Sequence, residues 1–132
     1  MAECCPTCDQ RDLIGSRGAR LVLWQVPLLL FVAGILLGPA WRTVSWTAAL
    51  AVAGAACVAN AARCGRLHCY FTGPFYLLAA LATLTHGLGL LPLGSAGWTW
   101  IGAGVAVGSF LFGCVPEWIW GTYARRDRPA GG

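Results

Sequence analysis

Residues that can hold a metal ion or carry thiol chemistry gather in one short stretch, RCGRLHCYFTGP. Cys64 and Cys69 lie close together in it, and His68 adjoins the second thiol. Thiolate sulfur is the ligand that Cu(I), Zn(II) and similar soft cations prefer. Arg63 and Arg66 favour the thiolate form of their neighbours because they are positively charged. The stretch predicts a soft-metal site. The alternative is a polar loop whose cysteines act only as small apolar residues.

A second group of thiols precedes the first apolar segment, in ECCPTC, and consists of Cys4, Cys5 and Cys8. The CxxC spacing of Cys5 and Cys8 lets two thiolates close on one ion. Zinc is usually four-coordinate, so this tail could complete a zinc site begun by Cys64 and Cys69. The alternatives are a redox pair, an S-palmitoylation site and a tail without chemical role.

The composition indicates a membrane protein. The chain has 132 residues, of which 58% are hydrophobic and 11% charged, whereas soluble domains carry about 25% charged residues. Four apolar runs approach the ~20 helical residues that cross a bilayer. They span residues 21–38, 44–62, 74–91 and 98–120. We predict an all-α integral membrane four-helix bundle over 21–120, between cytoplasmic tails at 1–20 and 121–132.

Arginine placement predicts the orientation. Eight of the nine basic residues fall in the two tails and in the 63–73 loop, and Arg42 stands alone on the opposite side. Basic residues accumulate on the cytoplasmic side of membrane proteins. We therefore expect a multi-pass protein of the bacterial inner membrane with both termini in the cytoplasm. The same orientation puts an outer aromatic belt at Trp41, Trp46, Trp98 and Trp100.

Several polar side chains fall inside the predicted spans, where they are costly and often functional. Cys57, Asn60 and Cys64 share one helix face, and Cys114 and Glu117 lie at a similar depth in the fourth span. If the second and fourth spans are neighbours, an ion could pass from Cys57 and Cys114 towards the cytoplasmic thiols.

His86 stands alone in the third span. A hydroxyl or carbonyl group is the expected partner for such a histidine, and Thr83 and Thr85 are close by in the sequence. Gly104 and Gly108 form a small-residue face in the fourth span, which favours close helix packing.

The loop R-C-G-R-x-H-C-Y-F-T-G-P resembles that of a group of small bacterial membrane proteins to which no function is assigned. A weaker likeness, in size and cysteine content, is to the mercuric-ion uptake proteins of bacterial mercury resistance. Those proteins carry a vicinal cysteine pair inside the first span. Here the vicinal pair, Cys4 and Cys5, lies in the tail, and the first span has no cysteine.

The sequence predicts a protein that binds or transports a soft metal ion, with mercury, copper or zinc as candidates. It contains no paired acids, phosphate-binding loop or nucleophile elbow, so we expect no enzyme. The alternative is a structural or accessory subunit that docks a membrane partner or a second copy through its small-residue faces. The net charge of +4 follows from the arginines at the membrane surface, and we expect no nucleic-acid partner.

Overall fold

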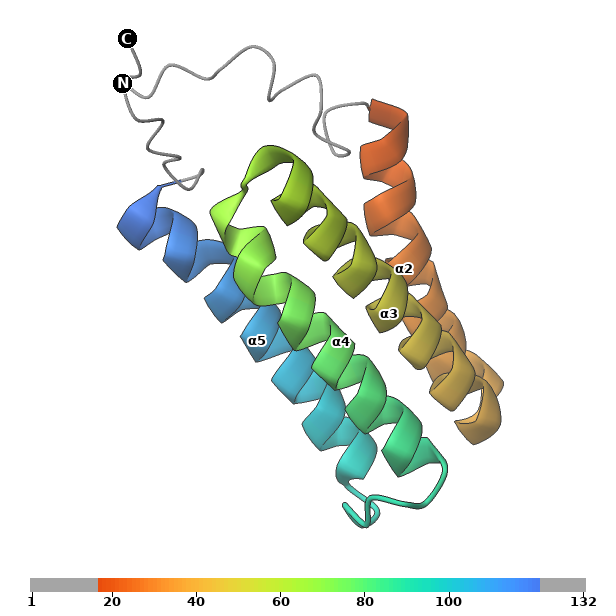
Figure 1. The fold of residues 1–132 in the computed structure, drawn as a ribbon. Helices are drawn as coiled ribbons and strands as arrows, with labels where there is room; N and C mark the ends of the chain where they lie inside the picture. Colours follow the sequence, from red (N-terminus) through yellow and green to blue (C-terminus); the bar gives the residue numbers. More distant parts are fainter. Residues whose placement is uncertain (1–16, 122–132) are drawn as a thin grey trace, which may run out of the picture.

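The computed structural model describes residues 17–121, which form four helices (Figure 1). They are α2 (Arg17–Leu37), α3 (Pro39–Cys64), α4 (Leu67–Gly87) and α5 (Gly97–Trp120). The predicted all-α four-helix bundle is confirmed. The side chains of a few residues within these helices, including Cys64 and Glu117, lie outside the description.

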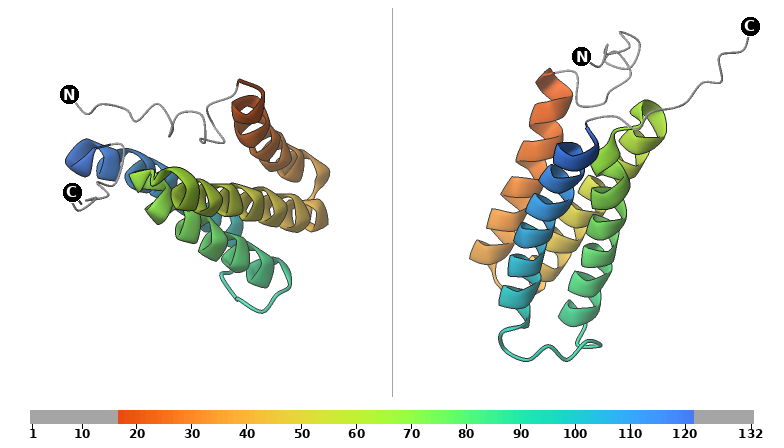
Figure 2. Two further views of the ribbon diagram at one scale, coloured as in Figure 1. Left: turned by 45° about the horizontal axis from the view of Figure 1, so that its top comes forward. Right: turned by 90° about the vertical axis from the view of Figure 1, so that its left-hand side faces the viewer.

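The helices run up and down and pack in chain order. α3 packs against both α2 and α4, and α4 packs against α5, whereas the backbones of α2 and α5 do not meet within residues 17–121. Figure 2 shows both ends of this open array. We call them the Gly38 end, where α2 joins α3, and the Gly65 end, where α3 joins α4. The long α4–α5 connection lies at the Gly38 end.

Three helices are long and apolar enough to cross a membrane: Pro39–Arg63, Leu67–Gly87 and Gly97–Trp120. The described apolar part of α2, Gln25–Leu37, is shorter, so a first membrane span over 21–38 stays a prediction. Many large apolar side chains of all four helices are exposed on the outside of the bundle. Such a surface suits a lipid surrounding, because lipid tails accept apolar side chains that water would not.

The predicted connections between the first and second spans (39–43) and between the second and third spans (63–73) are wrong, because the structure has shorter ones. Only Gly38 separates α2 from α3, because Pro39 can begin a helix whose first N–H groups need no partner. Only Gly65 and Arg66 separate α3 from α4. Gly65 ends α3 in a left-handed conformation (φ 65°, ψ 29°), with its N–H donating to the carbonyl of Ala61.

RCGRLHCYFTGP is consequently not a polar loop. α4 begins at Leu67, and Pro74 lies inside the helix instead of in its first turn. The physical reason is that a backbone at membrane depth must satisfy its own hydrogen bonds, which favours helix even where the side chains are polar. α4 also ends earlier than predicted, at Gly87.

Small residues bring α3 and α4 together. A Cβ added at Gly73 would lie 2.8 Å from Val58 Cγ2, and one added at Gly54 would lie 3.1 Å from the Gly73 carbonyl oxygen. The two predicted packing glycines of α5 differ. Gly108 packs under the ring of Phe75, which confirms helix packing there, whereas an added Cβ at Gly104 would have no neighbour within 4 Å among the described residues of the other helices. Packing through Gly104 is therefore not observed within residues 17–121.

Trp46 joins three helices at the Gly38 end. Its side chain is only 6% exposed, and its Nε1–H donates to the Phe31 carbonyl at 3.0 Å. Its ring contacts those of Phe31 in α2 and Trp98 in α5. The prediction that Trp46 belongs to an exposed aromatic belt is therefore wrong for this residue, although Trp41 and Trp100 are exposed.

Candidate thiol site

A buried polar cluster lies between α3 and α4, near the Gly65 end. Cys57 and Asn60 come from α3, and His68, Cys69 and Thr72 come from the first two turns of α4. Cys69 is fully buried, Asn60 is 1% exposed and Thr72 is 3% exposed. Buried polar groups in an apolar bundle are costly unless they find partners, so their concentration here identifies the candidate site.

The side chains of the cluster are partners of one another. The Cys57 thiol of α3 lies near Cys69 and Thr72 of α4. Asn60 Nδ2 donates to Cys69 Sγ at 3.8 Å, and His68 Nε2 lies 3.3 Å from the same sulfur. The Thr72 hydroxyl donates to the carbonyl of His68 at 2.9 Å. The contacts of Asn60 and His68 thus meet at the sulfur of Cys69.

The spacing of the residues along each helix explains how α3 and α4 each present their side chains to the cluster. Cys57 and Asn60 are three residues apart, as are Cys69 and Thr72, so each pair occupies one face of its helix. The tight turn at Gly65 then sets the two faces against each other. Sequence reasoning missed Thr72 because it assigned that residue to a loop. The signal that could have identified Thr72 is its spacing, since a hydroxyl three residues after Cys69 shares the helix face of that thiol.

The other residues of the predicted site at this end are two arginines and several residues that lie outside the description. Arg63 is exposed and Arg66 is partly buried at the turn. Cys4, Cys5 and Cys8 lie outside the described residues, as do the side chains of Cys64 and Glu117. These parts of the predicted site stay predictions.

The structure does not bring Cys57 and Cys114 together. Cys57 faces α4, whereas Cys114 is exposed on α5. Within the described chain, α3 and α5 have no close backbone contact. The condition that the predicted thiol relay required, that both thiols face the bundle interior within reach of each other, is not met.

If the described residues alone held a metal ion in the cluster, its ligands would be the two thiols of Cys57 and Cys69. Among residues 17–121, no three His, Cys, Asp or Glu side chains are grouped so that they could hold one metal ion. The three free cysteines described are Cys57, Cys69 and Cys114. A site with further ligands would have to draw them from Cys64 or from the tail.

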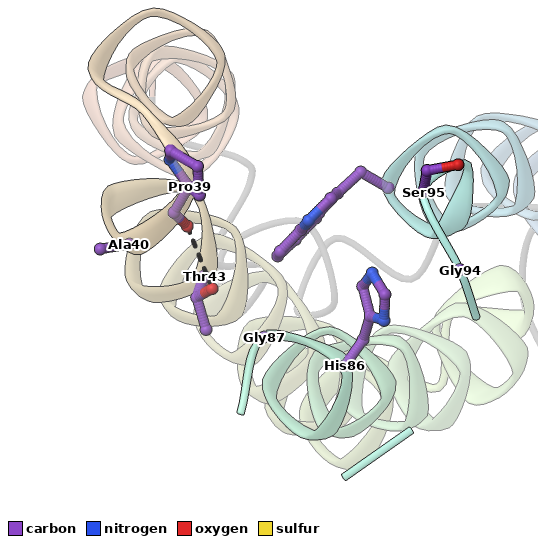
Figure 3. A pocket seen from close by; sticks show the side chains of 8 residues that line it. Pro39, Ala40, Thr43, His86, Gly87, Gly94 and Ser95 are labelled. Atoms are coloured by element: carbon purple, nitrogen blue, oxygen red, sulfur yellow. Dashed lines mark hydrogen bonds between the residues drawn. The ribbon is translucent and has the colours of Figure 1, made fainter. Parts of the chain in front are cut away.

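His86 lies at the other end of the bundle, beside a pocket of about 460 Å³ (Figure 3). As predicted, a carbonyl is its partner: Nδ1 lies 3.0 Å from the oxygen of Leu91. Thr83 and Thr85 instead donate to carbonyls of their own helix. The pocket is lined by Pro39, Ala40, Thr43, His86, Gly87, Gly94, Ser95 and Trp98.

Aromatic contacts hold His86 in place. Its ring meets that of Trp98 edge to face at 5.1 Å, and the Arg42 guanidinium lies 5.6 Å from the Trp98 ring centroid. Arg42 Nε also donates to the Gly34 carbonyl at 3.3 Å. These contacts fix the orientation of the His86 side chain at the Gly38 end.

In comparisons with known proteins, no family model, no curated protein and no solved structure matches the chain.

Proposed function

We propose that this protein binds a soft metal ion, cuprous or mercuric, within the membrane bundle at the Gly65 end, and thereby transports or retains it. The observation that carries the proposal is a buried polar cluster to which α3 contributes Cys57 and α4 contributes Cys69. Two thiols on the facing sides of neighbouring helices can supply sulfur ligands to one ion. Each thiol loses its proton when the metal binds.

The composition of the cluster favours a soft ion over a hard one. Mg²⁺ and Ca²⁺ select oxygen ligands and keep several of them, whereas thiolates select Cu(I) and other thiophilic cations. Zinc is a poorer candidate for the pair alone because its structural sites almost always have four ligands. Zinc would require Cys64 or the tail thiols in addition.

The proposed orientation supports this chemistry. Cytoplasmic thiols are kept reduced, so they remain available as ligands. With the Gly65 end in the cytoplasm, an ion bound between Cys57 and Cys69 could be exchanged with the tail thiols Cys4, Cys5 and Cys8. Each exchange replaces one sulfur ligand by another.

A Cu(I) titration of the purified, reduced protein in detergent, against a competing chromophoric chelator, tests the proposal. Cys57→Ser and Cys69→Ser should each weaken the tightest binding equivalent by at least about tenfold, since one of two sulfur ligands is lost. Cys114→Ser is the matched control and should leave that equivalent unchanged, because Cys114 is exposed on another helix. Equal affinity in all three variants would overturn the proposal.

A second candidate function, an accessory subunit of a membrane complex, is favoured by one observation. An apolar groove of about 180 Å³ between α4 and α5 includes Gly104, where an added Cβ would have no neighbour within 4 Å among the described residues of the other helices. A close-packed helix of a second protein would fit such a small-residue surface. Gly104→Leu should then separate the protein from its partner, so that native electrophoresis of mild-detergent extracts shows a smaller species. The unfolding temperature of the variant should stay unchanged. An unchanged species would exclude this interface.

A further inference from the structure

The pocket at the Gly38 end is separate from the thiol cluster and takes no part in the proposed metal binding. Its volume of about 460 Å³ falls within the range of about 300–1,000 Å³ that is usual for small-molecule sites. Its walls come from the beginning of α3, the end of α4 and the residues around the start of α5 (Figure 3). The pocket therefore lies where three helices end, which is the depth of lipid head groups around membrane-spanning helices.

Contacts within the chain hold the polar side chains of the wall. Thr43 Oγ1 donates to the Pro39 carbonyl at 3.2 Å, and His86 is held through Leu91. The Thr43 side chain also packs against Gly87, where an added Cβ would collide with it. The pocket is therefore formed before a ligand enters, which lowers the cost of binding.

The side chains at this end carry positive charge without a carboxylate among the described residues to balance it. Arg42 directly precedes the wall residue Thr43, and its guanidinium lies 5.6 Å from the centre of the Trp98 ring, which forms another wall. Between residues 17 and 121 the only acidic residue is Glu117, in the last turn of α5 at the opposite end. The Nε–H of Arg42 donates to the Gly34 carbonyl, but an arginine has five N–H donors. This charge balance disfavours a cationic ligand and favours an oxyanion.

The surroundings of the pocket favour an oxyanion that is attached to a lipid. Trp41 and Trp100 follow wall residues closely in the sequence and are exposed, and tryptophan prefers the head-group region of a bilayer. Leu88 and Leu90, which are 63% and 72% exposed, extend this apolar surface. Lipid chains gain from such a surface, whereas a dissolved phosphate does not. Basic pockets between membrane helices are known sites for anionic head groups.

We infer that this pocket binds the phosphate group of an anionic phospholipid. Arg42 supplies the charge, and the hydroxyl-bearing residues Thr43 and Ser95 line the space for the head group. A lipid bound here would contact α3, α4 and α5 together. It would thereby stabilise the array at an end where α3 and α5 have no close backbone contact within the described chain.

A photoreactive lipid tests the inference on the full-length protein. The protein is reconstituted in phosphatidylcholine vesicles that contain a minor share of phosphatidylglycerol with a diazirine on its head group. After irradiation and proteolysis, mass spectrometry should find crosslinks in the peptides that carry residues 39–43 and 86–98. Unlabelled phosphatidylglycerol should suppress these crosslinks at a concentration at which added phosphatidylcholine does not. Equal suppression by the two lipids, or an absence of crosslinks in these peptides, would overturn the inference.

Two matched variants of α3 test the pocket itself. Ala40→Phe should fill the pocket and remove its crosslinks, because Ala40 is a wall residue. Ala48→Phe is the control, since Ala48 is exposed on the same helix and is not a wall residue. Crosslinks near Arg63, at the other end of α3, serve as the internal reference in both variants. Pocket crosslinks that persist in Ala40→Phe would overturn the inference.

A third variant tests the charge. Arg42→Gln should raise the concentration of phosphatidylglycerol needed to suppress the pocket crosslinks by about fivefold, the usual effect of one basic side chain near an anionic lipid surface. An unchanged concentration would contradict the role of Arg42. Thermal unfolding of each variant identifies any loss of folding.

Dissolved glycerol phosphate distinguishes the two sources of the same oxyanion. It should not suppress the pocket crosslinks at concentrations at which phosphatidylglycerol does, because it lacks the lipid chains. Equal suppression would assign the pocket to a dissolved phosphate ester and overturn the lipid assignment. These experiments contain no metal, so their failure and a failure of Cu(I) binding are separate results.

Discussion

At the scale of the residue, Gly73 sets how closely α3 and α4 approach each other beside the thiol cluster. It lies one residue after Thr72 and has no side chain, so the backbone of α4 can rest against Val58 of α3. The cluster of Cys57, Cys69 and Thr72 lies beside this contact. In a bundle surrounded by lipid, such close backbone approach is the main source of helix association. Gly73 is therefore as important for the site as the cysteines.

Gly73→Ala should separate α3 from α4 and destabilise the bundle. The added methyl carbon would lie 3.2 Å from a backbone nitrogen, which cannot rotate away. We expect an overpacking cost of about 1–3 kcal/mol, partly offset by the better helix propensity of alanine, about 1 kcal/mol. Gly104→Ala is the matched control, because no atom lies within 4 Å of its added Cβ.

Thermal unfolding in detergent measures the effect. Gly73→Ala should lower the unfolding temperature, while Gly104→Ala should leave it unchanged or raise it. Identical behaviour of the two variants would show that the α3–α4 contact is looser than described.

At the scale of the element, hydropathy predicted the number of helices but not where they end. The apolar runs of α3, α4 and α5 were evident, because lipid-exposed helices must be apolar along their length. The polar residues of RCGRLHCYFTGP lowered the local hydropathy and were assigned to a loop. Backbone hydrogen bonding overrides this signal, and Gly65 with Arg66 is enough to reverse the chain.

That difference explains what could be predicted of the site. Cys57 and Asn60 were assigned to one face of a helix from spacing alone, as observed. Their partners could not be assigned, because the register of α4 against α3 follows from the length of the connection between them. A loop over 63–73 would have put Cys69 and Thr72 outside the bundle; a two-residue turn puts both inside it.

At the scale of the whole molecule, the orientation in the membrane decides what the thiols can do. The Gly65 end carries Arg63 and Arg66, whereas the described residues near the Gly38 end include one arginine, Arg42, in the first turn of α3. The positive-inside rule predicts that the Gly65 end lies in the cytoplasm, where thiols are kept reduced. The reverse orientation would expose Cys57 and Cys69 to an oxidising compartment, where thiols are not kept reduced for metal binding.

Fusions at four positions test this orientation. Alkaline phosphatase, which is active only outside the cytoplasm, should be active when fused after Gly38 or Gly94 and inactive after Gly65 or Gly132. A fluorescent reporter that matures in the cytoplasm should give the opposite pattern, which controls for expression of each fusion. Because Arg63 and Arg66 flank the α3–α4 turn, changing both to alanine should weaken the preference without abolishing it, since the arginines of the two tails remain. Phosphatase activity of the fusion after Gly65, with the sequence otherwise unaltered, would show that the orientation is the reverse of the predicted one. The proposed metal site would then lie outside the reducing environment on which it depends.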